Sequence, residues 1–142
     1  MRCAIGADDT GPLTEALLAE LDRRGIAAER FGALRTPEDA EWASIGRAVG
    51  DAVAAGRADL GIVCCWTGTG ISIAANKVRG VRAALCGDAE TAAGARRWND
   101  ANVLALSLRA TSPAVGIEIL AAFLSSQAST DAADRRSIAA VE

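Results

Sequence analysis

The residues best suited to chemistry lie in one segment, residues 61–77, with the sequence GIVCCWTGTGISIAANK. Cys65 offers a thiol and Thr67 a hydroxyl. Gly68 and Gly70 follow, and glycines at alternate positions let the backbone approach a ligand closely. A helical pattern comes next, and the free amides at the start of a helix point at an anion bound there. The segment therefore predicts a site at which a thiol, a hydroxyl and main-chain amides meet.

A cysteine at the end of a strand is more often a packed thiol than a catalyst, and a glycine loop alone is weak support for a site. This loop is not the dinucleotide-binding fingerprint, and it lacks the Lys-Ser/Thr ending of a phosphate-binding P-loop. The amides of residues 68–72 would nevertheless favour a thiolate at Cys65 and stabilise a negative intermediate. Because the chain has no histidine, acid–base catalysis must fall to cysteine, aspartate, glutamate or hydroxyl groups.

The composition is that of a globular protein. The 142 residues fit one domain, residues 1–142, with a sizeable core, and 51% of them are hydrophobic. The net charge of −3, the pI near 5.0 and the lack of a basic stripe argue against a nucleic-acid partner. No apolar run is long enough to span a membrane, and the N-terminal MRCAIGADD is unlike a signal peptide. We therefore expect a cytoplasmic protein with no membrane partner.

The four cysteines lie on or beside predicted strands, at Cys3, Cys64, Cys65 and Cys86. They lack C-x-x-C spacing, and the chain has no histidine, so the sequence does not predict a zinc site. Three of them are best interpreted as reduced, packed thiols of a cytosolic protein. We expect neither a metal ion nor a cofactor.

Apolar runs and turn residues predict alternating strands and helices. Strands are expected over residues 2–7, 26–31, 60–64, 81–85 and 103–106. Helices are expected over residues 12–24, about 42–55, about 71–77, 89–98 and 113–125, and residues 126–142 form a C-terminal tail that is weakly helical from Asp131. This alternation predicts an α/β fold: a three-layer Rossmann-like sandwich whose five-stranded parallel sheet has helices on both faces.

Several candidate residues directly follow strands. Asp8 and Asp9 follow the first strand, residues 65–70 follow the third, and Arg109 follows the fifth. Ligands of such sheets bind outside the carboxyl ends of the strands, so we expect these residues to share one edge. From spacing alone, Asp8 and Asp9 are equally well explained as a turn.

Four stretches together resemble a known family: IGADD near the start, C-x-TG-x-GIS-IAANK, VRAALCGD, and WNDANVLALS-LR. Their order and spacing are similar to those of the ribose-5-phosphate isomerase B family, which includes the galactose-6-phosphate isomerase subunits. The resemblance covers nearly the whole chain, to about residue 125. It implies an aldose–ketose isomerase that works through an enediolate.

The resemblance also implies roles for individual residues. Cys65 is at the position of the catalytic base, which moves a proton between the first two carbons of the sugar, and Cys64 is its buried neighbour. Thr67 matches a hydroxyl residue near the ring oxygen of the substrate. Asp8 and Asn99 match residues that hold sugar hydroxyls. The main-chain amides of the enediolate hole match those of Gly68, Thr69, Gly70 and Ser72. The family is dimeric, so the resemblance implies a homodimer, or a dimer of dimers, with shared sites.

The chain departs from the family pattern at positions near the substrate. Asp9 stands where a phosphate-binding histidine is typical, and Trp98 stands where the family has its ring-opening histidine. Trp66 replaces a glycine and Trp42 a tyrosine. The phosphate-binding arginine Arg109 is kept, whereas only one of the two tail arginines has a counterpart, Arg136.

These departures predict a changed substrate. An indole N–H is only a donor, so Trp98 cannot shuttle a proton for ring opening. A carboxylate at Asp9 repels phosphate. We therefore expect an isomerase or epimerase acting on an acyclic, unphosphorylated or differently charged sugar-like substrate. Two alternatives stay open: a conventional ribose 5-phosphate/ribulose 5-phosphate isomerase, and a non-catalytic binding module on the same fold.

Overall fold

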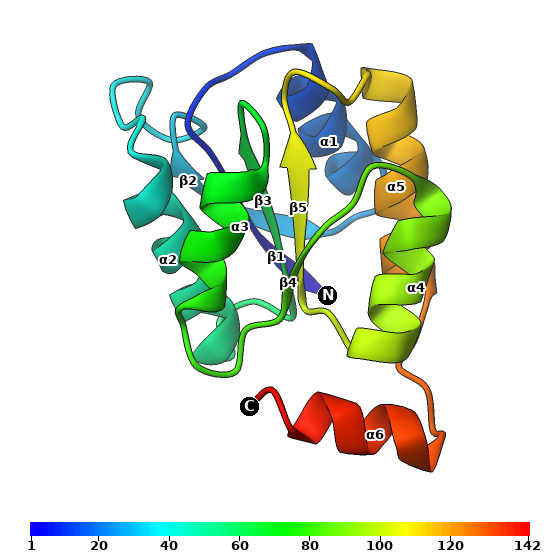
Figure 1. Cartoon of the computed structure of the whole chain (residues 1–142). Helices are drawn as coiled ribbons and strands as arrows, with labels where there is room; N and C mark the ends of the chain where they lie inside the picture. Colours follow the sequence, from blue (N-terminus) through cyan, green and yellow to red (C-terminus); the bar gives the residue numbers. More distant parts are fainter.

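A five-stranded parallel sheet forms the centre of the molecule. The computed structural model describes residues 1–142, and its strands are arranged in the order β2-β1-β3-β5-β4 (Figure 1). The strands are β1 (Arg2–Ala7), β2 (Ala27–Gly32), β3 (Leu60–Cys65), β4 (Ala83–Leu85) and β5 (Val103–Ser107). Every neighbouring pair is parallel, so the carboxyl ends of all five strands lie at one edge.

Helices cover both faces of this sheet (Figure 1). One layer consists of α1 (Pro12–Arg23), α4 (Ala89–Asn99) and α5 (Pro113–Ser125), whose apolar side chains form one core cluster with the sheet. The other consists of α2 (Trp42–Ala54) and α3 (Thr69–Asn76), which pack on the opposite face. The C-terminal helix α6 (Ala132–Ala139) lies below the amino edge of the sheet. The three-layer prediction is confirmed.

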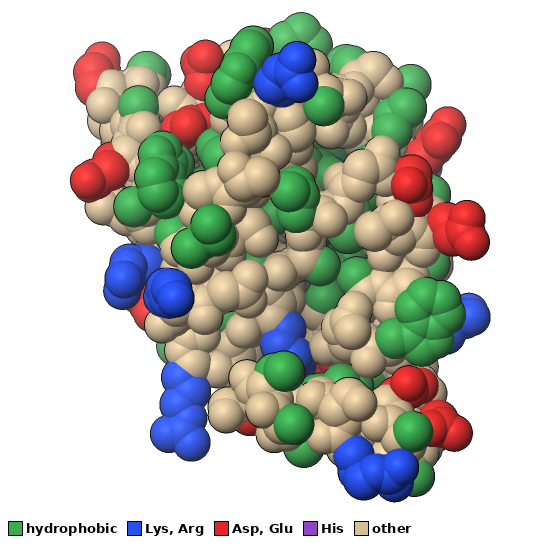
Figure 2. Space-filling model, in the orientation of Figure 1, with side chains coloured by type: hydrophobic (Ala, Val, Ile, Leu, Met, Phe, Trp, Pro, Cys, Tyr) green, Lys and Arg blue, Asp and Glu red, His purple; other side chains and the backbone are tan.

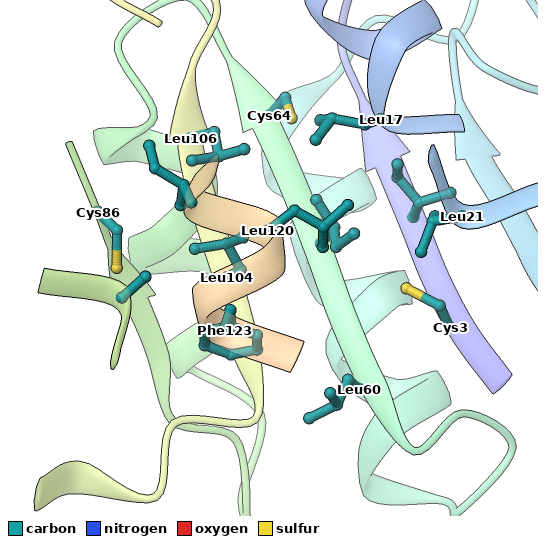
Figure 3. Close-up of a cluster of buried hydrophobic side chains, with 14 of the residues drawn as sticks. Cys3, Leu17, Leu21, Leu60, Cys64, Cys86, Leu104, Leu106, Leu120 and Phe123 are labelled. Carbon is teal, nitrogen blue, oxygen red and sulfur yellow. The ribbon is translucent and has the colours of Figure 1, made fainter. Parts of the chain in front are cut away.

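The adjacent cysteines of β3 face opposite layers. Cys64 belongs to the cluster under α1 and α5 and points toward Leu17 in Figure 3, whereas Cys65 belongs to the cluster under α2 and α3. This follows from the alternation of side chains along a strand. Burial raises the pKa of the Cys64 thiol to about 12, and it raises that of Cys3, in the same layer, equally far. These two thiols are packing groups.

The element ends differ from the predictions where tertiary contacts decide them. The third strand runs through Cys65, one residue further than predicted, and α3 begins at Thr69 instead of about residue 71. Gly68 makes the sharp turn between them: its φ of 76° lies in the left-handed region, which a glycine adopts at little cost. The fourth strand is shorter than predicted, because the amide of Arg82 donates to the side chain of Asn102 before β4 begins.

None of the helices is both long and apolar enough to cross a bilayer.

Candidate active site

The candidate site lies at the topological switch point of the sheet, between β1 and β3. The chain leaves β1 toward β2 on one side, while β3 lies on the other side of β1 and leads to the rest of the sheet. Parallel sheets bind ligands in the crevice at the carboxyl ends of such a strand pair. Ala7 lies opposite Cys64 in the register, and the amide of Asp8 donates to the carbonyl of Cys64 at 3.3 Å. Continuing this register brings Asp8 beside Cys65, as predicted for residues that follow neighbouring strands.

The loop after Cys65 is anchored by main-chain hydrogen bonds. The Cys65 carbonyl accepts from the amide of Gly68 at 3.2 Å and from the amide of Leu108 at 2.9 Å. The first bond closes the turn, and the second joins it to the end of the neighbouring strand β5. The backbone on either side of Cys65 is therefore fixed before any ligand arrives.

A second anchor holds the carbonyl of Trp66. It accepts from the amide of Arg109 at 3.0 Å and from the hydroxyl of Ser107 at 2.9 Å. The same hydroxyl accepts from the amide of Ala110 at 3.1 Å. Ser107 therefore fastens the cysteine loop to the turn that carries Arg109. Sequence reasoning missed this residue, although a hydroxyl two positions before Arg109 at a strand end was a usable signal.

The free amides at the start of α3 are fewer than predicted. The amide of Ser72 donates to the carbonyl of Gly68 at 3.3 Å, and the amide of Gly68 is used within the loop. The amides of Thr69, Gly70 and Ile71 have no acceptor in the chain. These three N–H groups, at the positive end of the helix dipole, are the donors available to a developing oxyanion.

Apolar and hydroxyl groups surround these amides. The indole of Trp42 lies against Gly70, because a β-carbon built on that glycine would come within 3.1 Å of the ring. The hydroxyls of Thr67 and Thr69 are hydrogen bonded to each other at 2.7 Å. Sequence reasoning assigned Trp42, Gly70, Thr67 and Thr69 to one site, and the structure brings them together.

The thiol and the two carboxylates differ in exposure. Cys65 is only 5% exposed. Asp8 is partly buried, and this desolvation, with a smaller contribution from the charge of Asp9, raises the pKa of the Asp8 carboxyl. Asp9 is exposed, and its Oδ1 accepts the amide of Thr10 at 2.8 Å. The turn interpretation therefore applies to Asp9, which keeps a second oxygen facing solvent.

A pocket of about 400 Å³ opens beside the loop at the carboxyl edge of the sheet. It lies between the ends of β3, β4 and β5, and Arg109 is the only charged side chain that lines it. Its lining residues are Thr67, Leu85, Cys86, Gly87, Ser107, Arg109, Ala110 and Thr111. No group of three or more histidine, cysteine, aspartate or glutamate side chains is placed to hold a metal ion.

The remaining predicted residues lie at the opposite edge of the sheet. After β4 the chain returns through α4 to the amino edge, where α4 ends at Trp98 and Asn99. Arg136 lies on α6, on the same side. Trp98 and Asn99 line a different pocket, of about 510 Å³, together with residues of α6. Within one chain the structure does not bring these three residues together with Cys65.

The model of the Ribose/Galactose Isomerase family matches residues 3–141. The chain belongs to this family. Its sequence is 34% identical to the D-erythrulose-4-phosphate isomerase of Pectobacterium atrosepticum, a match that covers 87% of this chain and 82% of the relative. It is 39% identical to the ribose-5-phosphate isomerase B of Escherichia coli, with 83% and 76% of the two chains covered.

Solved structures of the family have the same fold. The chain is similar to the ribose-5-phosphate isomerase B of Clostridium thermocellum with a TM-score of 0.92 and 34% identity, over 99% of this chain and 95% of that one. For the type B ribose 5-phosphate isomerase of Trypanosoma brucei the TM-score is 0.91 and the identity 39%, with the same coverage. As a member of the Ribose/Galactose Isomerase family, the chain is an isomerase of the ribose-5-phosphate isomerase B type, which confirms the family and the enzyme class predicted from the sequence.

Proposed function

We propose that this isomerase uses Cys65 as the base in an enediolate mechanism, on an acyclic, unphosphorylated or differently charged sugar. One observation carries the mechanism. Cys65 ends β3 directly before the turn into α3, whose first three amides are free, in a chain that has no histidine. A proton acceptor and donors for an oxyanion therefore adjoin each other at the carboxyl edge of the sheet.

The chemistry needs one proton acceptor and one set of oxyanion donors. The Cys65 thiolate takes a proton from the carbon next to the sugar carbonyl, and the electron pair moves onto the carbonyl oxygen to give the enediolate. The free amides of Thr69, Gly70 and Ile71 stabilise that negative charge. The thiol then returns the proton to the former carbonyl carbon, while the proton of the neighbouring hydroxyl passes to the enediolate oxygen. The carbonyl thereby moves to the adjacent carbon, and aldose and ketose exchange without a net change in redox state.

The tryptophan at position 98 supports an acyclic substrate. Trp98 occupies the position of the ring-opening histidine in the family pattern, and its indole N–H can donate a hydrogen bond but cannot take up or transfer a proton. A substrate that has no ring form does not need that step. The four-carbon ketose phosphate in the name of the Pectobacterium relative illustrates such chemistry, because the chain is too short to close a furanose ring.

The charge near Asp8 supports a substrate other than a ribose phosphate. Asp9 places a second carboxylate next to Asp8, and like charges so close disfavour a phosphate. An amine or a hydroxyl fits this position better. Arg109 favours the conventional alternative, because its guanidinium at the pocket can pair with a phosphate.

A homodimer would complete the site. The cysteine loop and the Asn99 group lie at opposite edges of one chain, so a second subunit in antiparallel orientation could bring Asn99 of the partner subunit to Cys65. The face around the edge strand β4 supports such a contact: it exposes Trp66 (66%), Ile73 (60%) and Leu85 (41%), and Figure 2 shows apolar side chains scattered over this side. We propose this dimer, or a dimer of dimers, as the active form.

The four buried, unpaired thiols of each chain favour a reducing compartment such as the cytoplasm.

The test is a turnover assay on a panel of sugars. The panel contains ribose 5-phosphate, D-erythrulose 4-phosphate, neutral tetroses and pentoses, and amino sugars. We expect the acyclic substrates to be preferred to ribose 5-phosphate. Turnover of ribose 5-phosphate in the usual enzyme range, with kcat of about 1–10³ per second, would favour the conventional alternative.

Cysteine variants test the assignment of the base. Cys65→Ala should abolish turnover of the best substrate while the protein stays folded by circular dichroism. Cys3→Ala is the matched control, because Cys3 is a buried thiol on β1, far from the carboxyl edge. Retained turnover in Cys65→Ala would show that another group is the base. Ligand binding without any turnover in the wild type would support the non-catalytic alternative.

A further inference from the structure

Arg82 joins β4 to the end of α4. Its side chain is only 18% exposed. Its Nε donates to the main-chain carbonyl of Asp100 at 2.9 Å, and its Nη2 donates to Oδ2 of the same residue at 3.0 Å. Two N–H groups of one rigid guanidinium therefore hold both the backbone and the side chain of Asp100.

Asp100 is the only residue other than glycine with a positive φ, 44°. A side-chain-bearing residue adopts this left-handed conformation at a cost, and keeps it only where its surroundings determine it. A second arginine contributes here. Nη1 of Arg96 donates to Oδ1 of Asp100 at 3.2 Å and to the carbonyl of Ala101 at 2.5 Å. Two guanidinium groups thus fix the turn that immediately follows Asn99.

Arg82 also contacts the C-terminal segment. Its remaining Nη1 forms an ion pair with Glu142, which follows α6. Helix α6 carries Arg136 and forms one wall of the 510 Å³ pocket that Asn99 lines on another side. One side chain therefore contacts both of the segments that present Asn99 and Arg136.

We infer that Arg82 is a positioning residue for the half of the active site formed by Trp98, Asn99 and Arg136. It acts through Asp100, which sets the end of α4, and through Glu142, which sets α6. The inference rests on the proposed function, in which this half-site completes the pocket of a partner subunit. One shared guanidinium aligns the two segments, which therefore do not find their places independently.

The chemistry of arginine explains why this residue type is required. A lysine at position 82 would keep the positive charge, but an ammonium is a point donor and cannot reach Asp100 O, Asp100 Oδ2 and Glu142 from one plane. Arg82→Lys therefore removes the planar set of N–H donors and keeps the positive charge. Loss of a charge-assisted hydrogen bond to Asp100 should loosen Asn99, which holds substrate, and leave Cys65 at the other edge untouched.

Steady-state kinetics on the best substrate of the panel test this inference. Arg82→Lys should raise KM by about tenfold with kcat unchanged, because positioning of the binding residue is lost and proton transfer is not. Arg2→Lys is the matched control. Arg2 also lies at the amino edge, donates to the carbonyl of Gly56 at 2.8 Å and pairs with Asp59, but contacts nothing near Asn99. An unchanged KM in Arg82→Lys would overturn the inference, as would an equal KM rise in Arg2→Lys.

Hydrogen exchange measures the same link without using activity. Arg82→Lys should speed the exchange of amides in both residues 98–102 and α6, whereas Glu142→Gln should speed it in α6 alone. Unchanged exchange in residues 98–102 of Arg82→Lys overturns the inference even if the isomerase activity is as proposed. Wild-type protein that turns over no sugar contradicts the proposed function, and the exchange result still decides whether Arg82 holds the two segments.

Discussion

The indole of Trp42 packs on the backbone of Gly70, so closely that a β-carbon on that glycine would lie 3.1 Å from the ring. This contact joins the start of α2 to the start of α3. It places an apolar wall beside the free amides that we assign to the enediolate. A change at either residue should therefore affect both stability and turnover.

Gly70→Ala should lower both the stability and kcat. The added methyl group must displace the Trp42 ring or the helix start, and overpacking of this kind costs about 1–3 kcal/mol. Chemical denaturation and steady-state kinetics measure the two effects. In the double variant Gly70→Ala/Trp42→Ala the space is restored, so the loss of stability should be smaller than the sum of the single losses. Gly87→Ala is the control for stability alone, because no atom lies within 4 Å of its added carbon. Strict additivity of the stability losses would contradict the contact.

Ser107→Ala should loosen the cysteine loop. The variant removes the donor to the Trp66 carbonyl and leaves the amide of Ala110 without its acceptor, at a cost of about 1–3 kcal/mol. We expect kcat to fall together with the free energy of unfolding. Ser112→Ala removes the N-cap of α5 and should cost about 1 kcal/mol with kcat unchanged. Equal effects of the two variants on kcat would argue against the anchor.

Stability should fall in acid partly through Glu20. Hydrogen bonds from Arg23 and Arg24 lower the pKa of its carboxyl from 4.5 to about 2. Because the folded-state pKa is depressed, this stabilising contribution is complete above 4.5 and is lost as the pH falls toward 2. Glu20→Gln should therefore be less stable than the wild type near neutral pH, with the difference shrinking below pH 4.5. Urea unfolding across this range measures it, and a difference that does not depend on pH would contradict the assignment.

Asp9→Asn should improve the use of phosphorylated sugars. Asp9 is exposed, so solvent screens its charge, and we expect a decrease in KM of only a few-fold, which corresponds to about 0.5–1 kcal/mol. The effect should fade at high salt. Asp51→Asn is the control. It removes an exposed carboxylate near the C-terminal end of α2 and should leave KM for phosphorylated sugars unchanged. A rise in KM for phosphorylated sugars in Asp9→Asn would contradict our interpretation of Asp9.

Local patterns in the sequence were enough to predict the sheet and one half of the site. The run at residues 2–7 forms β1 as predicted, and alternation along β3 correctly separates Cys64 from Cys65. The placement of Asp8, residues 65–70 and Arg109 at one edge follows from strands that are all parallel. These features depend on near neighbours in the chain.

What the sequence could not predict depends on the order of the strands. Ser107 and Leu108 hold the cysteine loop only because β5 lies next to β3, and no local pattern shows that neighbour. The start of α3 at Thr69 depends on the turn closed by Gly68. Helical spacing joins Arg96 to Asp100, but Arg82 lies 18 residues before Asp100 in the chain, so periodicity alone could not bring Arg82 there.

The most direct test of the central claim is exchange of substrate protons with solvent. In deuterated water, an enediolate formed by Cys65 should bring deuterium onto the carbon next to the carbonyl, detected by NMR of the recovered sugar. We predict incorporation with the wild type and with Cys3→Ala, and none with folded Cys65→Ala. Undiminished incorporation in Cys65→Ala would show that another group removes the proton, and would contradict the account.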